Sequence, residues 1–158
     1  MSQTITLDAR ELDFDPAVHP ERYDGVRTRR IFAFLIDAAV ILFLMVAAYV
    51  LIAVLGIFTL GLLWLLFPAV GPVVAILYST LTIGGPRSAT PGMRFMGIEI
   101  RNVRGEQIDY GIALLHVLGF WFSIAILTPL ILLVALFTER KQLLHDLILG
   151  TVAVRSAY

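Results

Sequence analysis

The fold is decided by the stretch RIFAFLIDAAVILFLMVAAYVLIAVLGIFTLGLLWLLFPAVGPVVAILYSTLTI, which covers residues 30–83. After Arg30, the only formally charged residue in it is Asp37. A helix needs about 20 apolar residues to cross a bilayer, so this stretch is long enough for two crossings. Gly56 and Gly61 enclose a short uncharged segment that favours a turn. The sequence therefore predicts two membrane-spanning helices with a tight reversal between them.

Three helical segments are expected, at about residues 30–55, 62–83 and 112–137. The second contains Pro68 and Pro72, which predict a kink. The third contains Pro129 and is either a third crossing or a hairpin that bends there and returns to the same side. The predicted fold class is an all-α membrane protein with about three transmembrane or re-entrant helical segments and a small β-prone cytoplasmic element.

The flanking segments are more polar. Residues 1–29 contain prolines and alternating charges, which predict a flexible amino-terminal arm, and residues 30–155 form the expected transmembrane domain. In the loop at 84–110, Ile98 to Arg101 alternate apolar and charged side chains, which is typical of a strand. Residues 143–149 are a short amphipathic segment, which Gly150 should end as a helix-stopping residue. A second β-prone segment follows at residues 151–154. Together the two β-prone segments account for the predicted β element.

Composition excludes several kinds of function. The chain of 158 residues is 59% hydrophobic, above the usual 45–50% or so of soluble proteins. Its formal net charge is zero, which gives no reason to expect nucleic-acid binding. The absence of cysteine excludes disulfides and thiolate chemistry. His19 and His116 are isolated, and His145-Asp146 has no further ligand at metal-binding spacing. We expect no metal, no cofactor and no enzymatic activity.

Basic residues predict the orientation in the membrane. Arginines 22, 27, 29 and 30 precede the first helix, and arginines 87, 94, 101 and 104 lie in the loop after the second. The positive-inside rule places the amino terminus and this loop in the cytoplasm. Arg140 and Lys141 favour a cytoplasmic tail too, whereas a simple third crossing would send it outside. We favour the cytoplasmic tail, where the two β-prone segments would pair with their valines and isoleucines buried and their charges in water.

Asp37 is the residue where structural and functional interpretations compete. Its cost at the centre of a bilayer is about 2.5–3.5 kcal/mol, so a partner or a function must offset it. Arg30 lies seven residues earlier, on the same helical face and about 10 Å away along the axis. One interpretation is a carboxylate neutralised by Arg30, by Arg94 or by a hydroxyl of Ser79, Thr80 or Thr82. The other is a carboxylate that binds a cation or a proton.

Three motifs carry a resemblance to a known family. They are residues 30–37 in the first helix, TPGMRFMGI at 90–98 and LHDLILGT at 144–151. Over about residues 25–155 the chain resembles the RDD family of bacterial membrane proteins, named for one arginine and two aspartates. The resemblance assigns these roles to Arg30, Asp37 and Asp146. It also marks a loop motif of Thr90, Pro91, Gly92, Arg94 and Gly97, with departures at Ala89 and Met93, where the family usually has Gln and Lys.

The resemblance implies a multi-pass protein of the bacterial inner membrane, in contact with the lipid bilayer. We expect a structural or accessory role in which Arg30, Asp37 and Asp146 approach within about 4–6 Å at the cytoplasmic interface. Because the family is suspected of transport, the alternative is a component that carries cations, protons or small solutes. Three crossings do not line an aqueous path alone, so that role would require self-association or a larger membrane complex.

Overall fold

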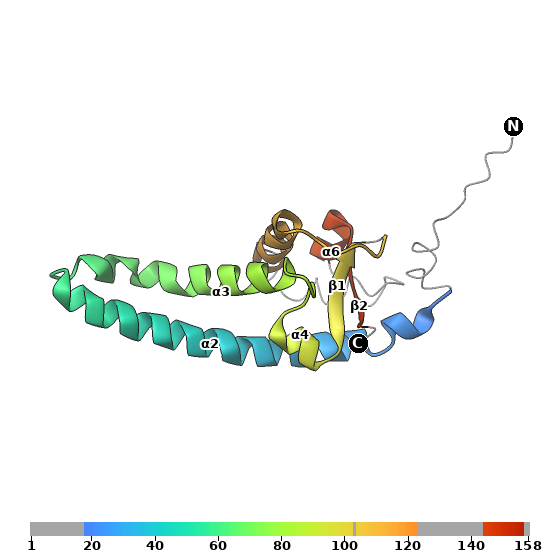
Figure 1. Ribbon diagram of the computed structural model, residues 1–158, viewed down its shortest axis with the longest axis horizontal. Coiled ribbons are helices and arrows are strands. Elements are labelled where there is room, and N and C mark those ends of the chain that lie inside the picture. Colours follow the sequence, from blue (N-terminus) through green and yellow to red (C-terminus); the bar gives the residue numbers. More distant parts are fainter. Residues whose placement is uncertain (1–17, 103, 123–143, 157–158) are drawn as a thin grey trace, which may run out of the picture.

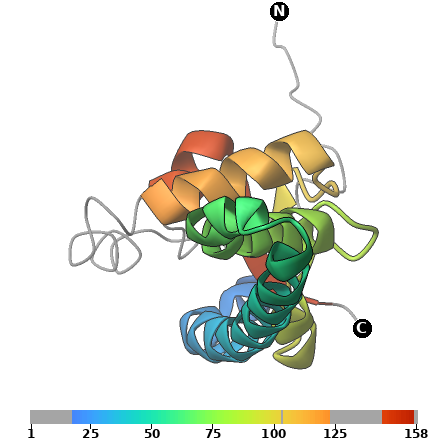
Figure 2. The ribbon, with the colours of Figure 1, turned by 90° about the vertical axis from the view of Figure 1, so that its left-hand side faces the viewer.

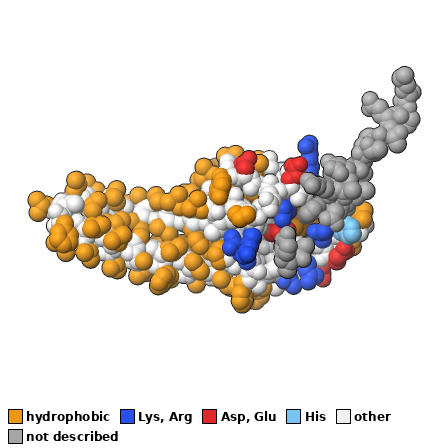
Figure 3. Space-filling model, in the orientation of Figure 1, with side chains coloured by type: hydrophobic (Ala, Val, Ile, Leu, Met, Phe, Trp, Pro, Cys, Tyr) orange, Lys and Arg blue, Asp and Glu red, His pale blue; other side chains and the backbone are white. Residues whose placement is uncertain are grey.

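A long apolar hairpin dominates the computed structural model, which describes residues 18–102, 104–122 and 144–156. Its arms are α2 (Val26–Phe58) and α3 (Phe67–Ile83), joined through the short 3-10 helix η2 (Leu62–Leu66) (Figure 1). Only 6% and 11% of the residues in the most apolar windows of the two arms are buried. Figure 3 shows hydrophobic side chains covering the far end of the hairpin. An apolar surface of this kind fits a lipid environment better than water.

The reversal of the hairpin comes later than the sequence predicts. Helix α2 begins at Val26, earlier than the expected residue 30, and it continues through Gly56 to Phe58. Gly56 stays helical, and the Trp64 ring lies so close to it that an added Cβ would be 2.0 Å from the indole nitrogen. The turn itself contains Gly61, whose φ of +89° is a conformation that glycine adopts without a steric penalty.

The sequence predicts a kink from Pro68 and Pro72, but Pro68 does not lie in the interior of an α-helix. Pro68 lies in the first turn of α3, where a missing N–H costs nothing, so it starts the helix instead of bending it. The preceding residues form η2 and are not the first turns of a longer α-helix. Pro72 does lie inside α3.

The other described elements gather at the end of the hairpin where α2 begins and α3 ends (Figure 1). They are η1 (Pro20–Tyr23), α4 (Pro91–Phe95), β1 (Ile98–Asn102), the helix Tyr110–Phe122, α6 (Leu144–Leu149) and β2 (Thr151–Arg155). The helix Tyr110–Phe122 runs across the end of α3 (Figure 2). We call this assembly the polar end.

Strands β1 and β2 form the predicted two-stranded sheet. They are antiparallel, with Ile98 opposite Arg155 and Asn102 opposite Thr151. Gly150 has a φ of +62° and ends α6 directly before β2, as its helix-stopping character predicts. Both strands and the end of the short helix are therefore confirmed.

The expected faces of the sheet need correction. Cross-strand neighbours project to the same face, and the register places Val154 opposite Glu99 and Val152 opposite Arg101. The valines therefore share a face with the charged residues, while Ala153 lies opposite Ile100. Glu99 is not in water: it is only 6% exposed, and its carboxylate lies 3.1 Å from the Arg101 guanidinium.

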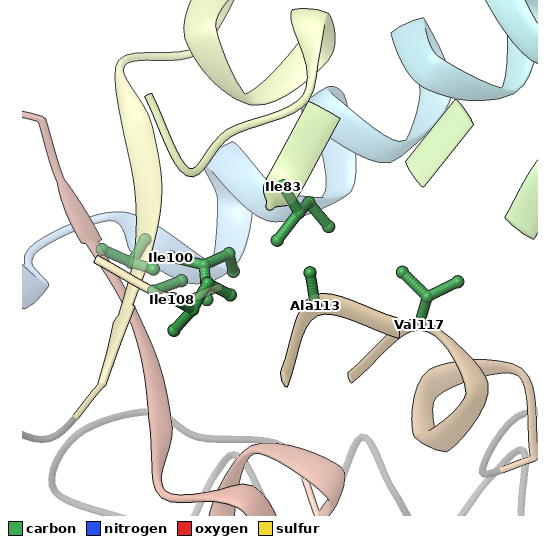
Figure 4. Close-up of a cluster of buried hydrophobic side chains, with 7 residues drawn as sticks. Ile83, Ile100, Ile108, Ala113 and Val117 are labelled. Atoms are coloured by element: carbon green, nitrogen blue, oxygen red, sulfur yellow. The ribbon is translucent and has the colours of Figure 1, made fainter. Parts of the chain in front are cut away.

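Both faces of the sheet are covered. On one face, Ile100 and Ala153 join Val26, Ile83, Ile108, Ala113 and Val117 in the main apolar core (Figure 4). On the other, Tyr23 of η1 packs with Val152 and Val154 and is only 2% exposed. Part of the predicted flexible arm therefore folds onto the sheet. Residues 1–17 of that arm lie outside the described residues.

The tail strand lies on the same end of the molecule as the loop. His116 Nδ1, in the helix Tyr110–Phe122, is 3.1 Å from Thr151 Oγ1 at the start of β2. This agrees with the favoured arrangement in which loop and tail share one side. The rest of the predicted third helix, with Pro129, lies outside the described residues, so the choice between a third crossing and a re-entrant hairpin stays a prediction.

Candidate functional site

Asp37 is held by hydrogen bonds from three groups of its own chain, an arrangement that we call the Asp37 site. The side chain is only 8% exposed on α2. Its Oδ1 accepts from the Tyr78 hydroxyl on α3 and from the Gly92 backbone N–H on α4, both at 2.8 Å. Its Oδ2 accepts from the Thr90 hydroxyl. Three donors provide the compensation that a buried carboxylate requires.

The loop motif explains this geometry residue by residue. Thr90 is the N-cap of α4: its Oγ1 accepts from the Met93 N–H at 3.1 Å and donates its own hydrogen to Asp37. Pro91 occupies the first turn of the helix, where proline is favoured. A Cβ on Gly92 would lie 2.3 Å from the Ala33 carbonyl oxygen, so only glycine allows α4 to approach α2 this closely. The sequence Thr90-Pro91-Gly92 therefore allows α4 to pack against Asp37.

The other residues of the loop motif determine how the chain passes from α4 into β1. Arg94 donates from Nε to the Ala89 carbonyl at 3.0 Å. Gly97 has a φ of +65°, which lets the chain turn directly from α4 into the strand. Arg29 of α2 donates to the Met96 carbonyl beside this turn. These bonds hold the short helix at both of its ends.

Arg30 and Asp146 form an ion pair between α2 and α6, which we call the Arg30–Asp146 pair. Arg30 Nη1 lies 2.7 Å from Asp146 Oδ2, and the aspartate side chain is fully buried. The other carboxylate oxygen accepts from Thr151 Oγ1 at 3.4 Å and lies 3.5 Å from His116 Nδ1. His116 is thus a buried, hydrogen-bonded residue of the polar end.

The single cluster expected from the sequence is instead two neighbouring sites. Arg30 and Asp146 meet as predicted, but within the part of the chain that the structure describes no ion pair links Arg30 to Asp37. Arg30 and Asp37 nevertheless line the same cavity, which has a volume of about 130 Å³. Its other polar lining includes Thr90, Ser79 and His116, and most of the remaining lining is apolar.

Sequence reasoning missed the true partners of Asp37. None of the expected partners bonds to it; the donors are Tyr78, Thr90 and the backbone of Gly92. One signal was present, because Thr-Pro is a common start of a helix and points to a hydroxyl in a capping position. Nothing in the local pattern distinguishes the phenol of Tyr78 from an ordinary interfacial aromatic residue.

The arrangement points to a class of protein. Two exposed apolar helices that are long enough to cross a membrane, joined to a polar end in which Asp37 and Asp146 have partners, fit an integral membrane protein. The model of the RDD family matches residues 25–150, and the chain belongs to this family. No curated protein and no solved structure matches the chain.

Proposed function

We propose that this protein is a structural or accessory component of a bacterial inner membrane, without enzymatic activity. The observation that carries the proposal is the set of three hydrogen bonds to Asp37, from α3, the α4 cap and the α4 backbone. A carboxylate that its own chain engages in this way fastens elements together. A carrier of a cation or a proton must instead release its own donors in each cycle.

The polar end belongs in the cytoplasm under this proposal, with the amino terminus. The support is the concentration of arginines just before and within the first turns of α2 and in the loop after α3, with no basic residue at the hairpin turn. The bilayer surrounds the hairpin, and the polar end is available to a second copy or to a larger membrane complex.

Proteoliposome flux tests the proposal. Purified protein should move neither protons nor monovalent cations faster than empty vesicles do. Asp37→Asn should leave that result unchanged while lowering thermal stability, because the amide cannot accept from all three donors as the carboxylate does. Flux in the native protein that Asp37→Asn abolishes would refute the structural role.

A pull-down in mild detergent tests the accessory role separately. The expected result is recovery of other membrane proteins together with the tagged chain. Recovery of the chain alone would argue against an accessory subunit.

Transport is the second candidate, and one observation favours it. The 130 Å³ cavity brings Asp37, Arg30 and His116 to the same space, which is large enough for water. A water-filled cavity beside a membrane carboxylate is a feature of ion pathways. Because the hairpin cannot line a path alone, this function requires a homo-oligomer or a partner, and the flux measurement above distinguishes the two candidates.

A further inference from the structure

A second cavity, separate from the Asp37 site, has a volume of about 530 Å³. It lies among the loop after α3, helix α4 and strand β1, and three arginines line it: Arg87, Arg94 and Arg101. We propose that this cavity binds a phosphate group with a net negative charge, carried either by the headgroup of an anionic lipid or by free phosphate.

The charge of the lining favours an anion. One acidic residue, Glu99, faces the three arginines. It is paired with Arg101 through two contacts, at 3.2 Å and 3.1 Å, so this carboxylate is neutralised within the wall. Arg87 and Arg94 remain as an excess of two positive charges around the same space.

The guanidinium groups of Arg87 and Arg94 have N–H donors that no described residue uses. Arg94 uses Nε to bond the Ala89 carbonyl at 3.0 Å, which fixes the plane of the group. Among the described residues, its two terminal nitrogens have no hydrogen-bond partner, and the exposed Arg87 side chain has none at all. Guanidinium groups bind phosphate oxygens through paired N–H donors, so unused donors of this kind suit a phosphate better than a carbonyl ligand.

The loop that carries Arg87 is held in place. The Gln107 side chain donates to the Pro86 carbonyl at 2.7 Å, and the Ile100 N–H donates to the Ser88 carbonyl at 2.8 Å. Both bonds tie the loop to the segment around β1. A site fixed before binding loses less freedom when the ligand arrives.

The position of the cavity makes a lipid source reasonable. Its loop directly follows Ile83, where the apolar hairpin ends, and Figure 3 shows basic side chains where the hydrophobic surface gives way to the polar end. Phe95, next to Arg94, is 81% exposed. An apolar side chain beside a cationic group is the composition expected at the level of lipid headgroups.

Titration calorimetry of the full-length protein in a non-ionic detergent tests the site. The probes are dioctanoyl phosphatidylglycerol, dioctanoyl phosphatidylcholine and inorganic phosphate. Arg87→Gln removes unused donors only. The double variant Arg87→Gln/Arg94→Gln also removes the donors of Arg94, including its bond to the Ala89 carbonyl. Arg104→Gln is the matched control, because it removes one exposed arginine of the same loop that does not line the cavity.

We expect the variants to weaken binding of an anionic probe by about tenfold or more, with the control unchanged. Loss confined to phosphatidylglycerol assigns the site to a lipid headgroup, and loss for inorganic phosphate assigns it to free phosphate. The proposal is overturned if neither anionic probe binds, or if native protein, variants and control bind alike. Arg87→Gln keeps the test independent of folding, because that side chain has no partner to lose among the described residues; equal melting temperatures check this.

Discussion

Gly92 brings the backbone of α4 into close contact with α2. Its amide donates to Asp37, and its missing side chain leaves room for the Ala33 carbonyl. Both properties serve the same contact, since a longer separation would break the hydrogen bond. At the residue scale, glycine is therefore required here by space and not by backbone conformation.

Gly92→Ala should destabilise the protein by about 1–3 kcal/mol, the usual cost of forcing a methyl group into a filled space. The new Cβ would lie 2.3 Å from the Ala33 oxygen and 2.8 Å from Asp37 Cγ, so the backbone of α2 or α4 and the Asp37 side chain would have to shift. Thermal unfolding in detergent measures the effect. Gly111→Ala is the control: it adds the same methyl group at an exposed site whose nearest neighbour is the Asp109 side chain at 3.2 Å. Equal stability of the two variants would contradict the close contact.

A double-mutant cycle should separate the two sites. Arg30→Gln and Asp146→Asn are expected to be non-additive by about 0.5–3 kcal/mol, because the residues contact each other at 2.7 Å. Arg30→Gln and Asp37→Asn should be more nearly additive, because no ion pair joins these side chains in the described structure. Unfolding free energies of the single and double variants supply the comparison. Stronger coupling of Arg30 to Asp37 than to Asp146 would restore the single cluster expected from the sequence.

At the scale of elements, the two-stranded sheet is stable because it is covered on both faces. Isolated two-stranded sheets are marginal in water. Here the core beneath Ile100 supports one face, and η1 supports the other through Tyr23. Helix η1 is consequently part of the folded polar end and not of a flexible arm.

Tyr23→Ala should loosen the sheet without disturbing the hairpin. Removing the ring leaves Val152 and Val154 without their cover, at a cost of about 3–5 kcal/mol for a buried aromatic side chain. Hydrogen exchange of the β2 amides should become faster, while that of α2 beyond Asp37 should stay unchanged. Val18→Ala, at a half-exposed position close by in the chain, is the control. Unchanged exchange in β2 would show that η1 does not support the sheet.

At the scale of the whole molecule, the apolar hairpin is joined to the polar end, in which β1 pairs with β2. The antiparallel pairing of β1 with β2 places the loop after α3 and the carboxyl-terminal tail at the same end of the molecule, and therefore on the same side of any membrane that the hairpin spans. The turn around Leu60, which is 97% exposed, lies at the other end of the hairpin.

Cysteine labelling on intact cells tests this topology, and the chain has no cysteine of its own. An impermeant thiol reagent should label Leu60→Cys from outside. It should label Ser156→Cys and Arg104→Cys only after the membrane is opened. Labelling of Ser156→Cys but not Arg104→Cys in intact cells would be incompatible with the sheet. Labelling of both would keep the sheet and reverse the predicted orientation.

What the sequence determined by itself was set by local composition. The apolar length from residue 31 to 83 required a hairpin, because hydrophobic length is a property of the chain alone. Alternation at Ile98–Arg101 and the stop at Gly150 depend equally on neighbouring residues, and both were predicted correctly. The RDD resemblance, carried by three short motifs, was confirmed by the family match.

Only the tertiary structure decided how these elements meet. Asp37 takes its donors from Tyr78 and Thr90, 41 and 53 residues away, and no local pattern encodes which hydroxyl arrives. The sheet register placed the valines beside Glu99 and Arg101, because a shift of one residue exchanges the two faces of a strand. The physical reason is common to both: periodicity fixes which residues share a face, but the packing of whole elements fixes which faces touch.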